Sequence, residues 1–318
     1  MKNFWYSYIF VSSVFLCFSA QANAAINNSS SSLVNTKKSC LDTPRLCIYQ
    51  VDESISNIKK HSIQWYRLIN LKLLAIWAIR DAKWMKQEIN KYVDLNDAPP
   101  VFLTTVYTLH AKMLFSDGNV TQGNLYANKA VELIKQVNEV SFDAARYAEI
   151  IILYNQLNQR KNAIEFINWI NQRIARMGPA HYFPNLQTAI AHTYFKTADY
   201  DLALSHYQNA STGFIEASNL LATAESYHNI ARALQGKNEY SRAITAFKKA
   251  LQWMEPAVKS GGYAITAKNY TQLRLIETLQ QNKQFLQAKL LLKQIKPKEV
   301  NQSSLTLYQQ LKLIQLNQ

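Results

Sequence analysis

Enzymatic chemistry needs nucleophiles, bases or metal ligands at defined spacings, and the sequence contains no such arrangement. It has no HExxH, no GxSxG, no glycine-rich phosphate loop and no cysteine–histidine pair in a plausible context. The six histidines are scattered, and no two carboxylates stand out as an acid and a base. We therefore predict a protein that is not an enzyme, uses no cofactor and acts by binding another macromolecule.

Two of the three cysteines, Cys40 and Cys47, lie close together in the segment SCLDTPRLC. The intervening Asp42, Thr43 and Pro44 favour a turn that would bring the two sulfurs together. In an oxidising compartment such a pair forms a disulfide, which we predict here; the alternative is two unconnected small hydrophobic residues. No second Cys or His pair with ligand spacing accompanies them, so we predict no metal site.

The first 24 residues have the features of a secretory signal. Lys2 provides a positive charge, an apolar run follows from Phe4 to Phe18, and Ala22-Asn23-Ala24 offers a cleavage site of small residues. The sequence therefore predicts an exported protein, periplasmic in a bacterium, from which residues 1–24 are removed. The alternative is a protein anchored in the membrane by residues 4–20, although this run is shorter than the ~20 apolar residues of a spanning helix.

The net charge of the chain is positive. Without residues 1–24, which contain one Lys and no acidic residue, the chain has 34 basic and 21 acidic residues and a net charge of +13. The basic residues are dispersed in runs of no more than two, which argues against a nucleic-acid partner. We expect an acidic or amphipathic protein or peptide as the partner, with an anionic envelope polymer as the alternative.

A repeated pattern organises most of the chain, in which Gly and Pro are rare and helix-forming residues dominate. A small residue recurs at intervals of 40, 40, 40 and 45 residues, as is typical of a solenoid. These small residues are Gly123, Ala163, Ala203, Ala243 and Ala288. Positions twelve and nine residues before them, and four and seven after them, are apolar and alternate in size. This alternation would let the two helices of a hairpin approach closely around a short polar turn, and two of the five turns contain Gly.

The pattern divides the chain into five parts. Residues 25–50 are polar at first and are expected to form a flexible tether, and residues 51–98, with Trp65, Trp77 and Trp84, a degenerate hairpin that caps the array. The predicted parts are the signal peptide at 1–24, the tether at 25–50, the cap at 51–98, five repeat hairpins at 99–297 and a capping helix at 298–318.

Residues 227–251 (YHNIARALQGKNEYSRAITAFKKAL) resemble a tetratricopeptide repeat. The matching residues are Tyr227, Ile230, Ala231, Leu234, Tyr240, Ala243, Phe247 and Ala250. Residues 186–210 resemble the same repeat through Ile190, Ala191, Tyr194, Tyr200, Ala203, Tyr207 and Ala210. The resemblance implies an all-α fold, a right-handed α-solenoid of antiparallel helix hairpins. Because the 40-residue period exceeds the family's usual 34, each hairpin is expected to be longer by about one helical turn.

The resemblance also implies a binding surface, because in this family the first helix of each hairpin lines a concave groove that holds peptides or partner helices. The groove positions in this sequence are Lys112, Phe115, Asn155, Thr188, His192, Phe195, His228, Asn229, Arg232 and Arg274. Some members clamp a C-terminal carboxylate; here Asn229 and Arg274 fall on two clamp positions, but Thr188, His192 and Tyr270 occupy the others. We therefore reject a standard clamp. The alternative for the whole groove is an ordinary hydrated helix face.

Three functions remain open at this point. The first is a non-enzymatic scaffold or adaptor of the cell envelope that holds a partner segment in the groove. The second is a module that senses a peptide or small molecule, and the third is a binder of an anionic envelope polymer. If the groove is the site, His192 and His228 would make binding sensitive to pH near ~6.5, provided that the fold does not shift their pKa values far.

Overall fold

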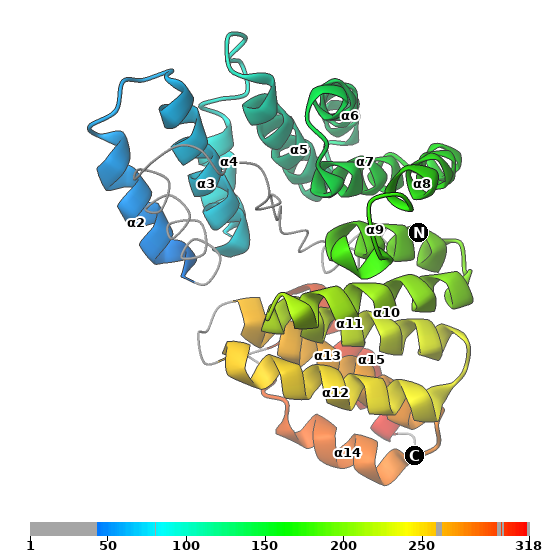
Figure 1. Ribbon diagram of the computed structural model, residues 1–318. Helices are drawn as coiled ribbons and strands as arrows, with labels where there is room; N and C mark the ends of the chain where they lie inside the picture. Colours follow the sequence, from blue (N-terminus) through cyan, green and yellow to red (C-terminus); the bar gives the residue numbers. More distant parts are fainter. Residues whose placement is uncertain (1–42, 80, 259–262, 298–299, 301, 317–318) are drawn as a thin grey trace. The chain divides into compact units, whose positions relative to one another are not determined.

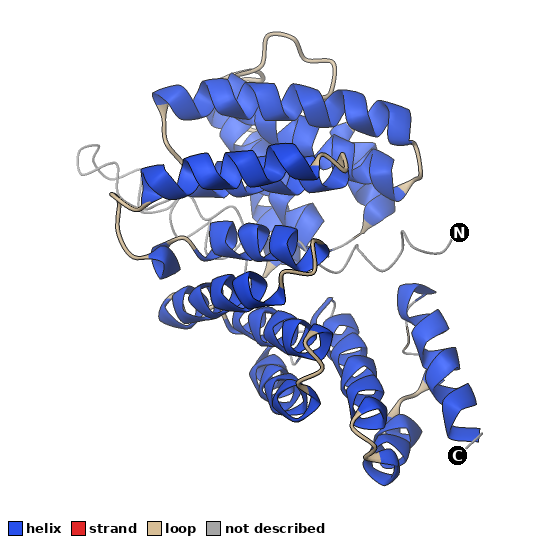
Figure 2. Cartoon of the chain, turned by 90° about the vertical axis from the view of Figure 1, so that its right-hand side faces the viewer, coloured by secondary structure: helices blue, strands red, loops and turns tan. Residues whose placement is uncertain are grey.

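The computed structural model describes residues 43–79, 81–258, 263–297, 300 and 302–316. All regular structure in these residues is helical, and they contain no strand (Figure 2). None of the helices in this part of the chain combines the length and the apolar character needed to cross a bilayer. The predicted signal segment 1–24 and Cys40 lie outside the described residues.

The described residues form two compact units, 43–159 and 160–316, and each is treated by itself. The first unit contains α2 (Pro44–Ile55), α3 (Ile63–Ile79), α4 (Ala82–Ile89), α5 (Pro100–Ser116), α6 (Val120–Val140) and α7 (Ala144–Gln156). Within it α2 packs on α3, α5 packs on α6, and α6 on α7. The predicted tether at 25–50 ends earlier than expected, because Pro44 begins a helix whose Cys47, Ile48 and Val51 are buried. The pairing of Cys47 with Cys40 stays a prediction.

The second unit contains α8 (Arg160–Ile174), a 3₁₀ turn η2 (Ala180–Tyr182), α9 (Pro184–Lys196), α10 (Tyr200–Glu216), α11 (Leu220–Gly236), α12 (Tyr240–Val258), α13 (Tyr263–Gln281), α14 (Phe285–Gln294) and α15 (Gln302–Leu316). Successive helices from α9 to α14 pack on one another, and Figure 1 shows α10, α11 and α12 stacked side by side. This succession of antiparallel hairpins confirms the predicted all-α class. The final helix packs on both α13 and α14, at the end of the stack.

One hydrogen bond recurs at the turn inside every repeat hairpin. In each hairpin the first helix ends in a C-cap residue. The backbone N–H two residues after this C-cap donates to the carbonyl five residues before the donor in the sequence, which is the hydrogen bond of a Schellman motif. The five bonds are Asn119 to Leu114, Gln159 to Tyr154, Asp199 to Tyr194, Glu239 to Leu234 and Gln284 to Leu279, at 2.8–2.9 Å between nitrogen and oxygen. The residue before each donor has a positive φ: Gly118, Asn158, Ala198, Asn238 and Lys283. Only one of the five is Gly, and in the fourth turn the left-handed residue is Asn238 rather than the nearby Gly236.

These turns carry the repeat spacing. The first helices of the five hairpins end at Ser116, Gln156, Lys196, Gly236 and Gln281, at intervals of 40, 40, 40 and 45 residues. Their beginnings at Pro100, Ala144, Pro184, Leu220 and Tyr263 are spaced irregularly, at 44, 40, 36 and 43 residues. The constant feature is therefore the turn within each hairpin, whereas the connections between hairpins vary in length.

The alternation of small and large residues predicted from the sequence is found in the core. Ala163, Ala203, Ala243 and Ala288 are completely buried, as are Ala111, Ala191 and Ala231 twelve residues before three of the five small-residue positions. Tyr207 and Phe247, four residues after Ala203 and Ala243, are the largest fully buried side chains among the residues that the structure describes. Small residues thus set the helix spacing, and two aromatic rings fill the space beside them.

Gly213 lies within α10, where the turn η2 packs against that helix. A Cβ atom at this position would overlap the carbonyl oxygen of His181, which belongs to the backbone and cannot rotate away. The sequence therefore places Gly in a helix interior at a point where the chain approaches too closely for any side chain.

We predict that Gly213→Ala destabilises the protein, although the same change in an open helix would stabilise it by roughly 1 kcal/mol. The chain around His181 must move to admit the methyl group, so the midpoint of urea unfolding should fall. Thr212→Ala, at the exposed neighbouring position, is the matched control and should leave the midpoint nearly unchanged. A Gly213→Ala protein that unfolds at or above the wild-type midpoint would contradict the close approach.

Candidate functional site

Seven of the ten predicted groove residues lie in the second unit, on the first helices of three successive hairpins. They are Thr188, His192 and Phe195 on α9, His228, Asn229 and Arg232 on α11, and Arg274 on α13. Two structural features lie among them: a cluster of polar side chains around Glu277, and a pocket beside it.

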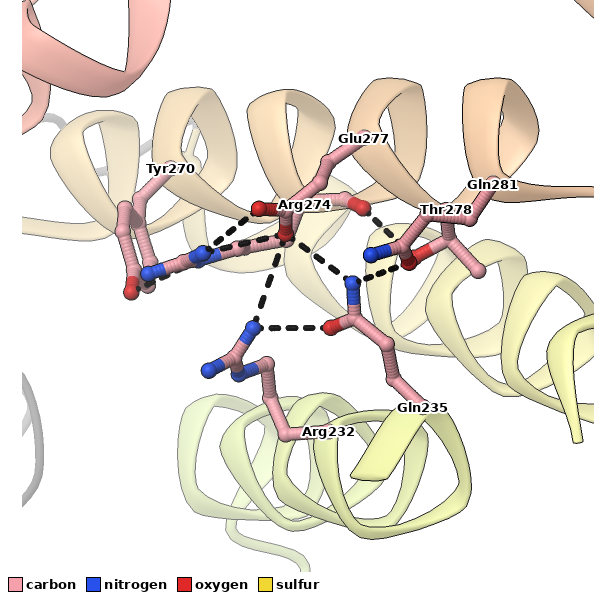
Figure 3. Close-up of polar contacts among 7 residues, drawn as sticks. All are labelled: Arg232, Gln235, Tyr270, Arg274, Glu277, Thr278 and Gln281. Carbon is pink, nitrogen blue, oxygen red and sulfur yellow. Dashed lines mark hydrogen bonds and ion pairs between the residues drawn. The ribbon is translucent and has the colours of Figure 1, made fainter. Parts of the chain in front are cut away.

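The polar cluster joins α11 to α13, and Figure 3 shows both guanidinium groups directed at one carboxylate. Arg274 donates to Glu277 through Nη1, at 3.0 Å and 3.2 Å from the two carboxylate oxygens, and through Nε to the Tyr270 hydroxyl at 2.9 Å. Arg232 Nη1 lies 3.6 Å from the same carboxylate and 2.7 Å from Gln235 Oε1. Gln235 in turn donates to Glu277 at 3.0 Å. We call these five residues the arginine cluster.

The arginine cluster holds two cationic groups and one anionic group in a partly desolvated position. The side chains of Arg232, Arg274 and Glu277 retain 26%, 15% and 24% of their exposure. Burial alone would raise the pKa of Glu277, but Arg274, the Gln235 hydrogen bond and Arg232 hold it below its ordinary value. Burial, and then the charge of Arg274, lower the pKa of Arg232, which still keeps its proton at neutral pH. The cluster therefore has one positive charge without a partner among its own members.

An aromatic ring lies beside each guanidinium group of the arginine cluster. The guanidinium of Arg232 lies 6.0 Å from the ring centre of Phe195, and that of Arg274 lies 5.1 Å from the ring centre of Tyr270. Phe195 itself packs edge-on against Tyr200. Three first helices, α9, α11 and α13, thus contribute to one surface of cations, amides and rings, which we call the first-helix face. Such a surface can bind a carboxylate together with apolar groups.

The pocket lies one helical turn from the arginine cluster, on the same helices. It is small, with a cavity volume of about 30 Å³, and it is partly open to solvent. Its lining residues are Thr188 on α9, Phe214 on α10, Ala222, Glu225, Ser226, His228 and Asn229 on α11, Met254 on α12, and Ala267 and Thr271 on α13. Three predicted groove residues, Thr188, His228 and Asn229, are therefore brought together here.

Two predicted groove residues are less available than expected. His192 is 8% exposed and is hydrogen-bonded to the Tyr207 hydroxyl, so it joins α9 to α10 instead of facing a partner. His228 is 9% exposed, and its Nδ1 lies 3.0 Å from Thr271 Oγ1. Burial, followed by the charges of Arg232 and Arg274, holds the pKa of His228 well below its ordinary value. The expectation that His228 titrates near pH 6.5 is therefore wrong.

The three groove residues of the first unit also have structural contacts. Lys112 is buried and forms an ion pair with Glu149 at 2.6 Å, and its ammonium lies 5.5 Å from the ring centre of Trp77. It was predicted as an accessible cation, and this prediction is wrong because Glu149, 37 residues further along the chain, neutralises it. Phe115 covers Gly123, which has no side chain to oppose the ring. Asn155 is half-buried on α7.

Sequence reasoning missed most of the pocket. Ser226 and Thr271 follow the helical spacing that leads to Asn229 and Arg274, so a closer look at small polar residues on these helices could have found them. Phe214 and Met254 come from second helices, where apolar residues were assigned to the core, and no sequence signal separates them from it. Among the described residues, no group of His, Cys, Asp or Glu side chains is arranged to hold a metal ion.

The low pKa of His228 predicts a loss of stability in mild acid. Below its ordinary pKa of 6.5 the unfolded chain binds a proton at this position that the folded chain does not bind. The contribution of His228 is therefore fully present above pH 6.5 and is lost as the pH falls below it. Glu277, whose pKa is lowered from 4.5, does not contribute to a change in this range.

We expect the urea midpoint of the wild-type protein to fall between about pH 7.5 and about pH 5.5 by more than the midpoint of His228→Gln. His110 and His206, whose pKa values are also lowered by burial, are present in both proteins and cancel in the comparison. Equal falls for both proteins would show that His228 titrates normally in the folded state.

Comparisons with known proteins agree with this architecture. Residues 182–255 match the family model described as a tetratricopeptide repeat. No curated protein sequence matches the chain. Similar solved structures include a Rap protein complexed with competence and sporulation factor, at 11% identity and a TM-score of 0.62, over 89% of this chain and 78% of that one. Another is the apo form of the quorum sensor NprR from B. thuringiensis, at 14% identity and a TM-score of 0.53, over 91% and 83%.

NprR in complex with its cognate peptide NprX is similar at 15% identity and a TM-score of 0.50, over 93% of this chain and 86% of that one. At such identities the likeness concerns the fold. The repeated Schellman turns, the buried small residues and the matching family model lead to one conclusion. Residues 182–255 match the tetratricopeptide repeat, and the chain has the fold of an α-solenoid of helix hairpins.

Proposed function

We propose that the chain is a non-enzymatic interaction module whose first-helix face binds a segment of another protein or a peptide. The observation that carries this proposal is the arginine cluster, where Arg232 and Arg274 share the single carboxylate of Glu277. A carboxylate of the partner would pair with the remaining positive charge in a partly desolvated position, where charge-assisted hydrogen bonds are strong. Phe195 and Tyr270 offer ring faces for apolar atoms of the same segment.

The structural neighbours support a peptide as the kind of partner. One of them holds its cognate peptide NprX, and another is complexed with competence and sporulation factor. Because these neighbours share the fold over most of their length, the comparable face of this chain is the first place to look for a bound segment. The expected acidic character of the partner comes from the arginine cluster of this chain and not from the neighbours.

Replacing both arginines should abolish selection for acidic peptides. The probe is a positional-scanning library of hexapeptides, acetylated and amidated at their ends so that charge comes from side chains alone. The wild-type protein should enrich Asp or Glu at one position, and Arg232→Gln with Arg274→Gln should weaken binding of the enriched peptides roughly 10- to 100-fold, as expected for loss of a charge-assisted hydrogen bond.

Arg242→Gln is the control for this experiment. Arg242 is a surface arginine of α12, 63% exposed and paired with Glu239, and it belongs to a second helix. It should select the same peptides as the wild type, and circular dichroism should show equal helicity for all three proteins. Retention of acidic peptides by the double variant at wild-type strength would exclude the arginine cluster as the binding site.

We further propose that the protein acts as an adaptor in the cell envelope. This location depends on residues 1–24, whose charged start, apolar run and small-residue cleavage site are those of a secretory signal. N-terminal sequencing of the protein from fractionated cells should find a mature chain that begins near Ala25. A chain that keeps Met1 and stays in the soluble cytoplasmic fraction would refute export.

A further inference from the structure

The pocket beside the arginine cluster has an unusual distribution of hydrogen-bonding groups. Three of its lining residues carry hydroxyl groups, and each hydroxyl lies at hydrogen-bond distance from a carbonyl of the preceding helical turn. The distances are 2.9 Å from Thr188 to Pro184, 2.9 Å from Ser226 to Ala222 and 2.8 Å from Thr271 to Ala267. A carbonyl oxygen can only accept, so in each pair the hydroxyl donates its one hydrogen. In any further hydrogen bond, each of the three hydroxyl oxygens can therefore only act as the acceptor.

The same reasoning fixes the tautomer of His228. Its Nδ1 lies 3.0 Å from Thr271 Oγ1, whose hydrogen is already given to Ala267. Thr271 can then only accept, so Nδ1 must carry a hydrogen and donate it. Because burial and the two nearby arginines keep the imidazole neutral, its other nitrogen, Nε2, has no hydrogen and is an acceptor. No hydrogen bond to Nε2 occurs among the residues that the structure describes.

The rest of the lining adds an apolar floor. It contains no Lys or Arg, and Glu225, its one acidic residue, already has an interaction of its own. Asn229 is the single side chain of the lining with an amide that can donate as well as accept. Phe214, Ala222, Met254 and Ala267 supply apolar surface, of which Phe214 and Met254 are almost completely buried. The pocket thus suits a group with an apolar stem and a donor at its end.

The charge of the favoured group follows from the surroundings. Asn229 and Thr271 each precede an arginine of the cluster by three residues, which is about one helical turn or about 5 Å. This positive charge opposes an ammonium group in the pocket, while the acceptor groups oppose a carboxylate. An uncharged hydrogen-bond donor avoids both the repulsion by the arginines and the repulsion by the acceptor groups.

We propose that this pocket recognises one uncharged side chain that ends in an O–H or N–H donor, on the same segment whose carboxylate pairs with the arginine cluster. The inference rests on the proposed function and adds a second element to it. Because the two sites are about one helical turn apart and an extended chain advances about 3.3 Å per residue, the donor and the acid should lie within about two residues of each other.

The tautomer can be measured without any ligand. Two-bond ¹H–¹⁵N correlation spectra of the full chain, with His228 assigned by comparison with His228→Gln, should show a neutral ring protonated at Nδ1 at about pH 7.5. Thr271→Val removes the acceptor and should shift the ring toward the Nε2-protonated form. A wild-type ring protonated at Nε2 would turn the pocket nitrogen into a donor and overturn the inference.

The hexapeptide library tests recognition. Near the selected acid, the wild-type protein should prefer Thr over Val by roughly tenfold, the cost of leaving a buried acceptor unpaired. Thr271→Val and Ser226→Ala should reduce this ratio toward one while the preference for the acid remains. Thr278→Val is the matched control, because Thr278 is a buried residue of α13 outside the pocket whose hydroxyl also donates to its own helix.

The outcomes separate the two proposals. Selection of an acid with no donor preference in the wild type overturns the pocket inference alone. Loss of the donor preference in Thr278→Val to the same degree as in Thr271→Val also overturns it, because the effect would then not come from the pocket. A wild-type protein that selects neither an acid nor a donor overturns both proposals.

Discussion

A single backbone hydrogen bond, repeated at each hairpin turn, determines where every first helix stops and every second helix starts. It closes the end of the first helix and turns the chain back within three residues, so that the two helices can pack along their length. The closure requires a left-handed residue, and four of the five turns provide it with Asn, Ala or Lys at a cost of about 1 kcal/mol each. Burial of the small and aromatic residues on either side of the turn outweighs that cost.

The first-helix face is a consequence of this geometry. Because the first helices of successive hairpins run in the same direction beside each other, side chains at equal distances from the turns meet across helices. Arg232 of α11 reaches Glu277 of α13 in this way, because each lies four residues before the end of its helix, whereas Arg274 pairs with Glu277 within α13. The guanidinium groups of Arg232 and Arg274 would repel each other, but Glu277 and Gln235 lie between them. The excess positive charge is left at the surface.

The fold was predictable from the sequence because its main signal is local and repeated. A small residue about every 40 positions, with apolar residues at fixed distances, is sufficient to predict hairpins of packed helices. The left-handed residues were less predictable, since the sequence signal for such a turn is Gly, and Ala198 or Lys283 gives no indication of a positive φ.

The site was only partly predictable, because its properties depend on contacts between distant segments. Arg232 and Arg274 were found from their helix positions, and the structure brings them together. Lys112 has the same helix position and charge type, yet Glu149 pairs with it and removes it from the surface. His228 was expected to titrate, whereas its burial between two hairpins and the arginines nearby keep it neutral. The positions of Lys112 and His228 on their helices do not reveal that one is paired with a buried carboxylate and that the other is removed from water.

The first helices begin at irregular intervals along the sequence. This irregularity indicates where the chain can accept insertions and deletions. In a helix each added residue rotates the later side chains by about 100°, so an insertion inside a first helix would turn the side chains on its two sides away from one common face. An insertion in a connection between hairpins, before a first helix begins, leaves the phase of that helix relative to its own turn unchanged. Insertions and deletions can therefore accumulate between hairpins without altering which side chains lie on the first-helix face, and that face is protected from variation in the spacing of the repeats.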